Sequence, residues 1–407
     1  MTTVIRRATA PLAALKHRPW PLSTAVAPHL DTKQLIEEEN TPYYDPRLFY
    51  PACLGDVLNS RYQLAAKLGY GTNSTVWLAR DLNHLPRRRG TAEAEQDTLR
   101  LISETNPQHK GYPFVRHLLD SFHLQHESKK CLVLVFEPLR EPLWLYRQRF
   151  IGDTIPSDVL KIMLQMILHG LDYLHTGCHI IHPDLKPDNI MVQLEDPSIL
   201  EESAKNEYQN PLPQKNHPDG RTIYLSRNNY GLPRNTTGII QITDFDLSVS
   251  GDNPNVGCIQ AEIHRAPEVI LDAGYSYSAD IWNLGVMLWD VLEGRKLFKD
   301  IDPLHVQEYN ELGHLACITE LLGDPPKELL DKGRRTSRFC TGQGIFKGPT
   351  VDPTTFNFEN LLNNVKGENK RMFIEFVKRM MKWRPEERSI ARELLQAPWL
   401  YAEFEED

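Results

Sequence analysis

Apolar and polar positions alternate in the early part of the chain, as they do in β-strands. Residues 61–80 alternate in this way and turn at Gly69 and Gly71, which predicts two strands joined by a glycine-rich loop. Residues 131–136 form a short apolar run that predicts a buried strand, and residues 239–242 predict another. Most of the predicted strands therefore lie before residue 140.

Helical periodicity dominates the rest of the chain. In residues 157–175, apolar side chains recur every three or four positions, which predicts a helix with one apolar face. Residues 278–293 are apolar on nearly all sides, so we expect a helix in the core of a larger unit, ended by Gly294. Further helices are predicted at residues 93–103, 308–322 and 369–381.

Two segments lack these patterns. Residues 193–238 are polar and rich in Pro and Asn, which predicts an insert. Residues 1–30 contain basic, Ser, Thr and Ala residues and no acidic residue before Asp31, a composition typical of a mitochondrial transit peptide. The prolines of this segment suit a disordered tail, which is the interpretation we favour for residues 1–40.

Composition narrows the class of protein. With 407 residues, 41% of them hydrophobic and 25% charged, the chain is typical of a soluble protein and long enough for two lobes. A net charge of -8 argues against a general nucleic-acid binder, and the apolar runs are too short to cross a bilayer. The six cysteines form no CxxC pair, which favours reduced intracellular thiols. We expect a monomer in the cytoplasm and nucleus, with mitochondrial import as the alternative and neither nucleic acid nor a membrane as a direct partner.

The run HPDLKPDN at residues 182–189 carries the clearest chemistry. Asp184 can accept a proton from an attacking hydroxyl, Lys186 can steady a transferred phosphoryl group, and Asn189 can hold a magnesium ion. Two prolines stiffen the loop that presents these side chains. A lone His-x-Asp would be weak evidence, because a satisfied loop histidine is more common, but the complete run is far more specific.

This run, with Ile-Met-Val behind it, resembles the catalytic loop of eukaryotic protein kinases. The resemblance implies Asp184, Lys186 and Asn189 as catalytic residues. It also implies an α+β, bilobal fold, with a small, mainly β N-lobe and a larger, mainly α C-lobe. The expected N-lobe is shortened and spans residues 62–139, and the expected C-lobe spans residues 140–400 with the insert 193–238.

The segment LGYGTNSTV at residues 68–76 fits a hairpin that covers phosphates, because small residues let backbone amides approach an anion. Glycine turns are common, but this one lies upstream of the catalytic loop, as in kinases. The resemblance then implies an ATP-binding set that comprises Leu68, Gly69, Gly71, Ser74, Val76, Glu95, Phe136, Glu137, Leu139 and Met191.

Asp244 follows an apolar strand, where its carboxylate would bind magnesium together with Asn189. A simple strand-end turn is the alternative, because Asp is frequent in such turns. The motif Ala-Pro-Glu, which ends at Glu268, matches the end of a kinase activation segment. By resemblance, Asp280 would brace the catalytic loop and Arg388 would pair with Glu268.

Among kinases, the chain looks most like the SR-protein kinases. The segments STVWLARD (residues 74–81) and HLACITELLG (residues 314–323) carry this likeness, together with the polar insert. It implies ATP and Mg²⁺ as cofactors and serine in Arg/Ser-rich proteins as the substrate. Pro183 stands where many kinases carry an arginine, so activation should not need a phosphate gripped at that position.

Two departures from the kinase pattern bear on activity. Kinases carry a Val-Ala-x-Lys strand after the glycine hairpin, but this chain has no lysine between Lys67 and Lys110. Arginines at residues 87–89 could substitute, although a solvated turn is the simpler interpretation. Asp246 replaces the glycine that usually ends the metal-binding motif, and only glycine adopts some backbone angles without strain.

Two functions therefore stay open. The first is an active serine/threonine protein kinase, which the intact catalytic loop and Asp244 favour. The second is a pseudokinase scaffold that keeps the fold but transfers phosphate poorly, which the missing lysine favours. We favour the enzyme.

Overall fold

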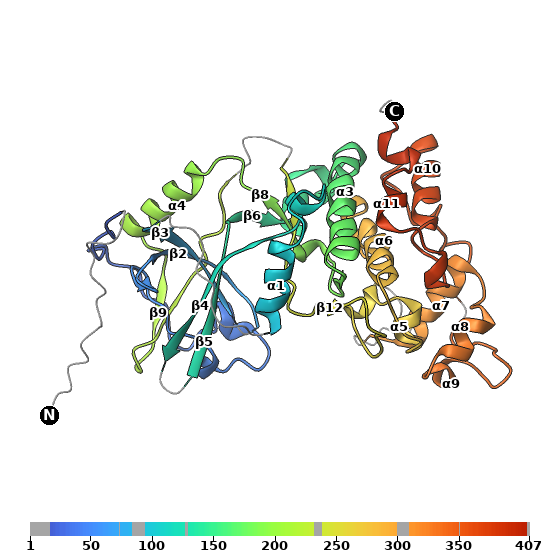
Figure 1. Cartoon of the computed structure of the whole chain (residues 1–407), viewed down its shortest axis with the longest axis horizontal. Helices are drawn as coiled ribbons and strands as arrows, with labels where there is room; N and C mark the ends of the chain where they lie inside the picture. The colour runs from blue at the N-terminus through green and yellow to red at the C-terminus, as the bar shows by residue number, and fades with distance from the viewer. Residues whose placement is uncertain are drawn as a thin grey trace. The chain divides into compact units, whose positions relative to one another are not determined.

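The structure is a computed structural model, and it describes residues 17–72, 74–83, 94–126, 129–231, 238–298, 309–349 and 351–404. The chain forms two compact units (Figure 1). The first comprises residues 1–92, 118–140 and 194–236, and the second comprises residues 93–117, 141–193 and 237–407. The first unit is rich in strands and the second in helices, which confirms the predicted α+β class.

The first unit is built on two hairpins. Strands β1 (Val57–Leu58), β2 (Tyr62–Tyr70) and β3 (Thr75–Asp81) form an antiparallel sheet, in which β2 and β3 are the two strands predicted around the glycine loop. Strands β4 (Leu118–His126) and β5 (Lys129–Phe136) form a second antiparallel hairpin. The apolar run predicted as a buried strand lies within β5.

The two hairpins belong to separate sheets, and no strand within the described residues joins them. Side chains connect them instead, because the Tyr62 hydroxyl donates to the Asp120 carboxylate at 2.7 Å. The Tyr62 ring also stacks on Phe122, with 5.7 Å between ring centroids. The segment after β3, where a kinase carries its Val-Ala-x-Lys strand and where this chain has the arginines at residues 87–89, lies outside the described residues from residue 84 to residue 93.

The insert belongs to the first unit. Its residues form helix α4 (Ser198–Gln209) and the hairpin β9 (Gln214–Asn216) and β10 (Thr222–Tyr224), although the sequence predicts it only as a polar insert within residues 140–400. Ala204 of α4 packs against Ala65, Ala66 and Leu78. This packing helps to explain why β2 is buried over six consecutive residues rather than on alternate ones.

Short strands position the loops of the second unit. Its three-stranded sheet has the order β11-β8-β6, from Ile240–Ile242, Ile190–Gln193 and Leu139–Pro142, and the β11 and β8 strands are antiparallel. A two-stranded sheet joins β7 (Ile180–Ile181) to β12 (Val249–Ser250). The predicted strand at residues 239–242 is therefore confirmed as β11.

Helices are the main secondary structure of the second unit (Figure 1). Helix α6 is buried nearly all round, as predicted, because Trp282, Trp289 and the other apolar residues of this helix have no more than 2% of their surface exposed. The helices are α1 (Ala94–Glu104), α2 (Leu143–Tyr146), α3 (Ser157–Asp172), α5 (Pro267–Ile270), α6 (Ser278–Leu292), α7 (Glu311–Leu322), α8 (Lys327–Lys332), α9 (Thr336–Phe339), α10 (Gly367–Lys378) and α11 (Ala391–Leu394).

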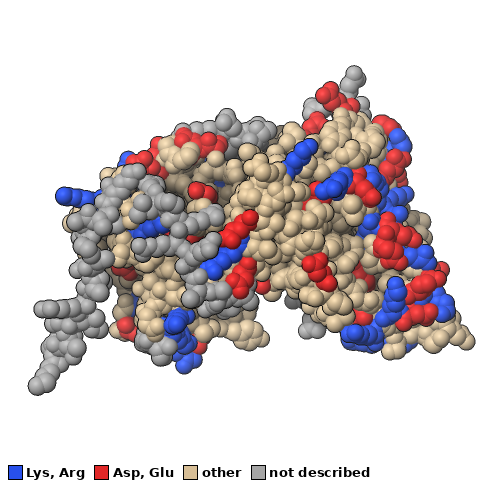
Figure 2. Space-filling view, viewed as in Figure 1, with Lys and Arg blue, Asp and Glu red and all other residues tan. Residues whose placement is uncertain are grey.

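The surface of the second unit is mixed in charge. Basic and acidic side chains are interspersed on the face that Figure 2 shows. On α10, for example, Arg371 pairs with Glu368 and Glu375 on the exposed side of the helix. Among the described residues, no helix is both long enough and apolar enough to pass through a bilayer.

Candidate active site

The catalytic-loop motif lies between β7 and β8 in the second unit. Its last three residues form a single 3-10 turn, Pro187–Asn189, in which the Asn189 amide donates to the Lys186 carbonyl at 2.9 Å. Pro187 suits the first position of this turn, because its missing N–H would have no partner there. The turn brings the side chains of the motif back onto one another.

Asp184 is the centre of this loop. Its Oδ2 atom accepts hydrogen bonds from Lys186 Nζ at 2.7 Å and from Asn189 Nδ2 at 3.0 Å. Asn189 Nδ2 also donates to the Asp184 carbonyl at 2.9 Å. Asn189 is buried, whereas Asp184 and Lys186 are half-exposed. The three residues predicted to be catalytic therefore form one hydrogen-bonded group that solvent can reach.

Pairing of β8 with β11 brings Asp244 to this group. Ile242 lies opposite Ile190, and the Thr243 amide donates to the Asn189 carbonyl at 2.9 Å. Asp244 follows with a positive φ of 67°, in the left-handed region that Asp tolerates better than most residues. Asp244 remains accessible to solvent at the end of the strand.

Negative charge accumulates around Asp244. Partial burial of its carboxyl group, a hydrogen bond with Asp246 and the charge of Asp184 raise the pKa of Asp244 to about 7, while Lys186 opposes the shift. Burial by itself would lower the pKa of Lys186, but its hydrogen bond to Asp184 and the nearby carboxylates raise it. Asp246, the residue in place of glycine, thus adds a carboxylate directly beside the predicted metal ligand.

The donor atoms fit a magnesium ion. Mg²⁺ prefers oxygen ligands and is usually held by one or two carboxylates together with phosphates and water. Because Asn189 uses its amide nitrogen for Asp184, its Oδ1 atom is left to join Asp244 as a ligand. Within the described residues, no cluster of three or more His, Cys, Asp or Glu side chains is arranged to hold a metal by itself.

Two buried contacts that the resemblance implies are present in the second unit. The Asp280 carboxylate in α6 accepts from the main chain of His182 at 2.8 Å, as the resemblance implies. Arg388 forms two hydrogen bonds of 2.7 Å with Glu268, and neither side chain has exposed surface. Both predicted pairings are therefore confirmed.

The glycine hairpin lies in the first unit. A Cβ atom added to Gly69 would meet no atom within 4 Å, so the backbone is open to an approaching group there. The Gly71 amide donates to the Ser74 carbonyl at 2.8 Å and closes the turn. Val76 and Ser74 are exposed, whereas Leu68 packs against the cluster of Ala65, Ala66 and Leu78.

The remaining residues of the predicted ATP-binding set lie at the end of β5, in β6, in β8 and in α1. Phe136 ends β5, Glu137 is exposed directly after it, and Leu139 is buried at the start of β6. Met191 is half-buried in β8, and the Glu95 side chain lies outside the described residues. Because the glycine hairpin and Met191 belong to different units, the ATP-binding set as a whole stays a prediction.

Comparison with known proteins settles the family. The sequence pattern of the protein kinase domain matches residues 62–400. The chain belongs to the protein kinase family. This kinase is 35% identical over 395 residues to a serine/threonine protein kinase of Aspergillus fumigatus, with 93% of this chain and 94% of that protein covered.

Other relatives of this kinase confirm its likeness to the SR-protein kinases. It is 30% identical to the serine/threonine-protein kinase SRPK of Physarum polycephalum, with 89% of this chain and 91% of that protein covered. It is 25% identical to SRSF protein kinase 3 of Mus musculus, with 89% and 90% covered. A crystal structure described as a kinase domain has the same fold, with a TM-score of 0.63, 21% identity and 88% of this chain covered.

Sequence reasoning missed two supporting residues of this site. His175 places its Nε2 atom 2.8 Å from Asp280, and Thr243 contacts the Asn189 carbonyl through both its amide and its hydroxyl. A single sequence gives no signal for the first contact, because 105 residues separate the partners. For Thr243, the only signal in the sequence is its position directly before Asp244, the predicted metal ligand.

Proposed function

We propose that this kinase is an active serine/threonine kinase that transfers the γ-phosphate of ATP to serine in Arg/Ser-rich proteins. The observation that carries the proposal is the hydrogen-bonded group of Asp184, Lys186 and Asn189, with Asp244 beside it. Phosphoryl transfer needs positioned charges more than covalent chemistry, and this group supplies a base, a cation and oxygen ligands.

Asp184 would act as the base. Its carboxylate is accessible, and it would accept the proton as the serine oxygen bonds to the γ-phosphorus and the bond to ADP breaks. Lys186, whose raised pKa keeps it protonated, would turn from Asp184 to the transferring phosphoryl group. Asn189 and Asp244 would hold Mg²⁺, which neutralises phosphate charge when bound.

The proposed substrate class rests on the relatives and on charge. Two relatives are named SRPK and SRSF protein kinase 3, and this chain covers most of their length. A net charge of -8 suits an arginine-rich peptide, because opposite charges attract substrate and enzyme. We therefore propose a protein substrate with alternating Arg and Ser, bound by a monomeric kinase.

A pseudokinase scaffold is the second candidate. It is favoured by the absence of lysine between Lys67 and Lys110 in the sequence. Such a protein would keep the fold and bind nucleotide but transfer phosphate slowly or not at all.

The test is transfer of labelled γ-phosphate to an Arg/Ser peptide in the presence of Mg²⁺. The active-kinase proposal predicts labelling that disappears in Asp184→Ala and in a peptide whose serines are replaced by alanine. Asp188→Ala is the matched control, because Asp188 is exposed in the same loop and has no proposed role. ATP binding without transfer by the wild-type protein would favour the scaffold.

A further inference from the structure

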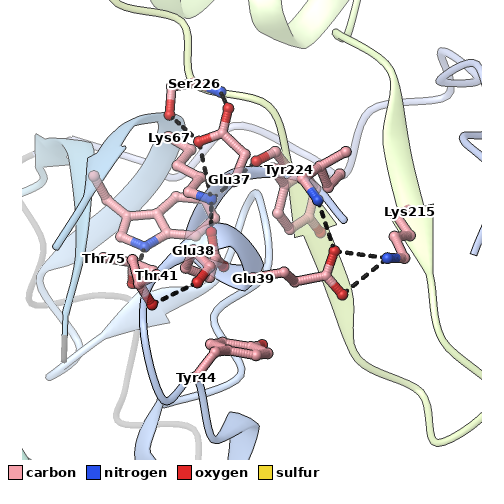
Figure 3. Close-up of polar contacts among 12 residues, drawn as sticks. Glu37, Glu38, Glu39, Thr41, Tyr44, Lys67, Thr75, Lys215, Tyr224 and Ser226 are labelled. Carbon is pink, nitrogen blue, oxygen red and sulfur yellow. Dashed lines mark hydrogen bonds and ion pairs between the residues drawn. The ribbon is translucent and has the colours of Figure 1, made fainter. Parts of the chain in front are cut away.

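A short segment before the first sheet, residues 36–41, inserts three consecutive glutamates into the first unit, so the disordered tail expected for residues 1–40 does not extend over residues 36–40. We call this segment the N-terminal strap. Its Glu37–Asn40 portion forms a 3-10 turn that contacts β2. Figure 3 shows the three glutamates reaching three different partners, Ser226, Lys67 and Lys215. One partner comes from the glycine hairpin and two come from the insert.

Lys67 has partners in both the strap and the insert. Its Nζ atom donates to the Glu38 carboxylate and, at 3.0 Å, to the Tyr224 carbonyl, while the Glu37 carboxylate lies 3.5 Å away. The Lys67 carbonyl accepts from the Arg227 amide at 2.7 Å. Only 1% of the Lys67 side chain is exposed. The strap and the insert therefore enclose the residue that lies two positions before Gly69.

The other two glutamates fasten the strap to the insert. Lys215 Nζ lies 2.8 and 2.6 Å from the two carboxylate oxygens of Glu39, and its side chain is also almost wholly buried. The Ser226 hydroxyl and amide donate to Glu37 at 2.5 and 3.0 Å. Glu37 has a positive φ of 51°, which a glutamate rarely adopts. The turn that carries the three glutamates therefore includes one residue in a strained backbone conformation.

These contacts meet at the part of the hairpin that leads into the glycine loop. Lys67 lies opposite Trp77, and the pairing shifts by one residue between Lys67 and Gly69, which is a β-bulge. Trp77 packs edge-on against the Tyr224 ring, with 5.5 Å between centroids. Tyr224 therefore contacts both strands, one through its carbonyl and the other through its ring.

We propose that Lys67, Glu38 and Tyr224 are positioning residues for the glycine loop. A buried ion pair adds little net stability but favours a single arrangement, because any other leaves a charge without its partner. Held in this way, the Lys67–Trp77 pair fixes where the bulge occurs and where the loop begins. The strap and the insert thereby support the end of the hairpin that leads into the glycine loop, whereas β1 pairs with β2 only near its start, opposite Tyr62 and Gln63.

The test compares Glu38→Gln with Glu201→Gln. The first keeps the shape of the side chain but removes its charge from Lys67, whereas the second breaks an exposed pair with Lys205 in α4 of the same insert. The measurement is hydrogen exchange of the amides of residues 68–71 and 74–76. Because hydrogen bonds to charged groups are the stronger ones, we expect exchange about tenfold faster in Glu38→Gln, and unchanged exchange in β4–β5 and in the control.

A second variant keeps the test decisive if Glu38→Gln does not fold. Tyr224→Leu removes the ring contact with Trp77 without altering a charge, and we expect the same local loosening of the hairpin. Equal exchange in Glu38→Gln and Glu201→Gln would overturn the proposal. Faster exchange spread evenly over β4–β5 would also overturn it, because it would indicate general destabilisation.

The KM for ATP provides a second measurement, and this measurement alone rests on the proposed function. A loosened glycine loop should raise the KM for ATP several-fold in Glu38→Gln, while kcat changes little. Hydrogen exchange needs no catalysis. If the wild-type protein transfers no phosphate but shows the local exchange pattern, the proposed function fails and the positioning role stands.

Discussion

Asp280 and His182 join the core helix α6 to the catalytic loop, because the Asp280 Oδ2 atom accepts from the His182 main-chain amide at 2.8 Å. The same oxygen lies 2.8 Å from the ring of His175, and Asp280 has no exposed surface. The His182 ring also contacts the carbonyl of Thr243, the residue before Asp244. One buried carboxylate thus supports the loop that carries Asp184 and, through His182, the segment that carries Asp244.

Replacing Asp280 tests this support. Asp280→Ala leaves two buried polar groups without an acceptor, which costs about 1–3 kcal/mol of stability for each group. We expect kcat for phosphate transfer to fall by about tenfold or more, because small displacements of a catalytic group are costly. Asp280→Asn keeps a side-chain oxygen in place and should retain more activity. Equal kcat values for wild type and Asp280→Ala would contradict this role.

The buried pair of Arg388 and Glu268 should matter for stability. Arg388→Met leaves a carboxylate buried without its partner, and such a change costs about 3–5 kcal/mol. Arg371→Met is the matched control, because Arg371 pairs with Glu368 on an exposed face, where such pairs contribute about 1 kcal/mol or less. Chemical denaturation measures both. If Arg388→Met and Arg371→Met lose similar amounts of unfolding free energy, burial of the Arg388–Glu268 pair does not matter for stability.

Because His314 is buried, we expect the free energy of unfolding to depend on pH. His314 is fully buried in α7, and burial, followed by the charges of His264 and Arg265, lowers its pKa to about 3. The unfolded state takes up a proton below about pH 6.5, whereas the folded state does not. The contribution of His314 to stability is therefore complete above about pH 6.5 and is lost as the pH falls towards 3.

His314→Gln checks this directly. Between about pH 7.5 and 5.5, the wild-type protein should lose about 1.4 kcal/mol through this residue, and the variant should lose correspondingly less. The control is His29→Gln, the same replacement at an exposed position. An identical slope in wild type and His314→Gln would contradict the prediction.

The second unit was the more predictable one, because its signals are local. The HPDLKPDN run lies within eight consecutive positions, and its side chains contact one another across a single turn. Helix α3 follows from apolar periodicity, helix α6 from a segment that is apolar on nearly all sides, and the strand before Asp244 from a short apolar run. The pairs of Asp280 and Arg388 span long distances in sequence and were reached only through the resemblance to kinases.

The first unit was harder to predict, because its support comes from distant and weakly patterned segments. Helix α4 is hidden in a polar insert, since its buried positions include Glu207 as well as Ile199 and Ala204. Lys67 lies in an alternating strand where a lysine would normally face solvent, and its partners Glu38 and Tyr224 lie 29 and 157 positions away. No local pattern signals such contacts.

We propose that Asp184, Asn189 and Asp244 form one site for a magnesium-bound nucleotide, in which Asp184 is the base and Asp244 binds the metal. The most direct measurement is the Kd for ATP with and without Mg²⁺ in wild type, Asp244→Asn and Asp184→Asn, together with phosphate transfer. We expect Mg²⁺ to tighten ATP binding in wild type and in Asp184→Asn, although Asp184→Asn transfers no phosphate. Asp244→Asn should lose the effect of Mg²⁺. A variant Asp244→Asn that responds to Mg²⁺ as wild type does would contradict the claim.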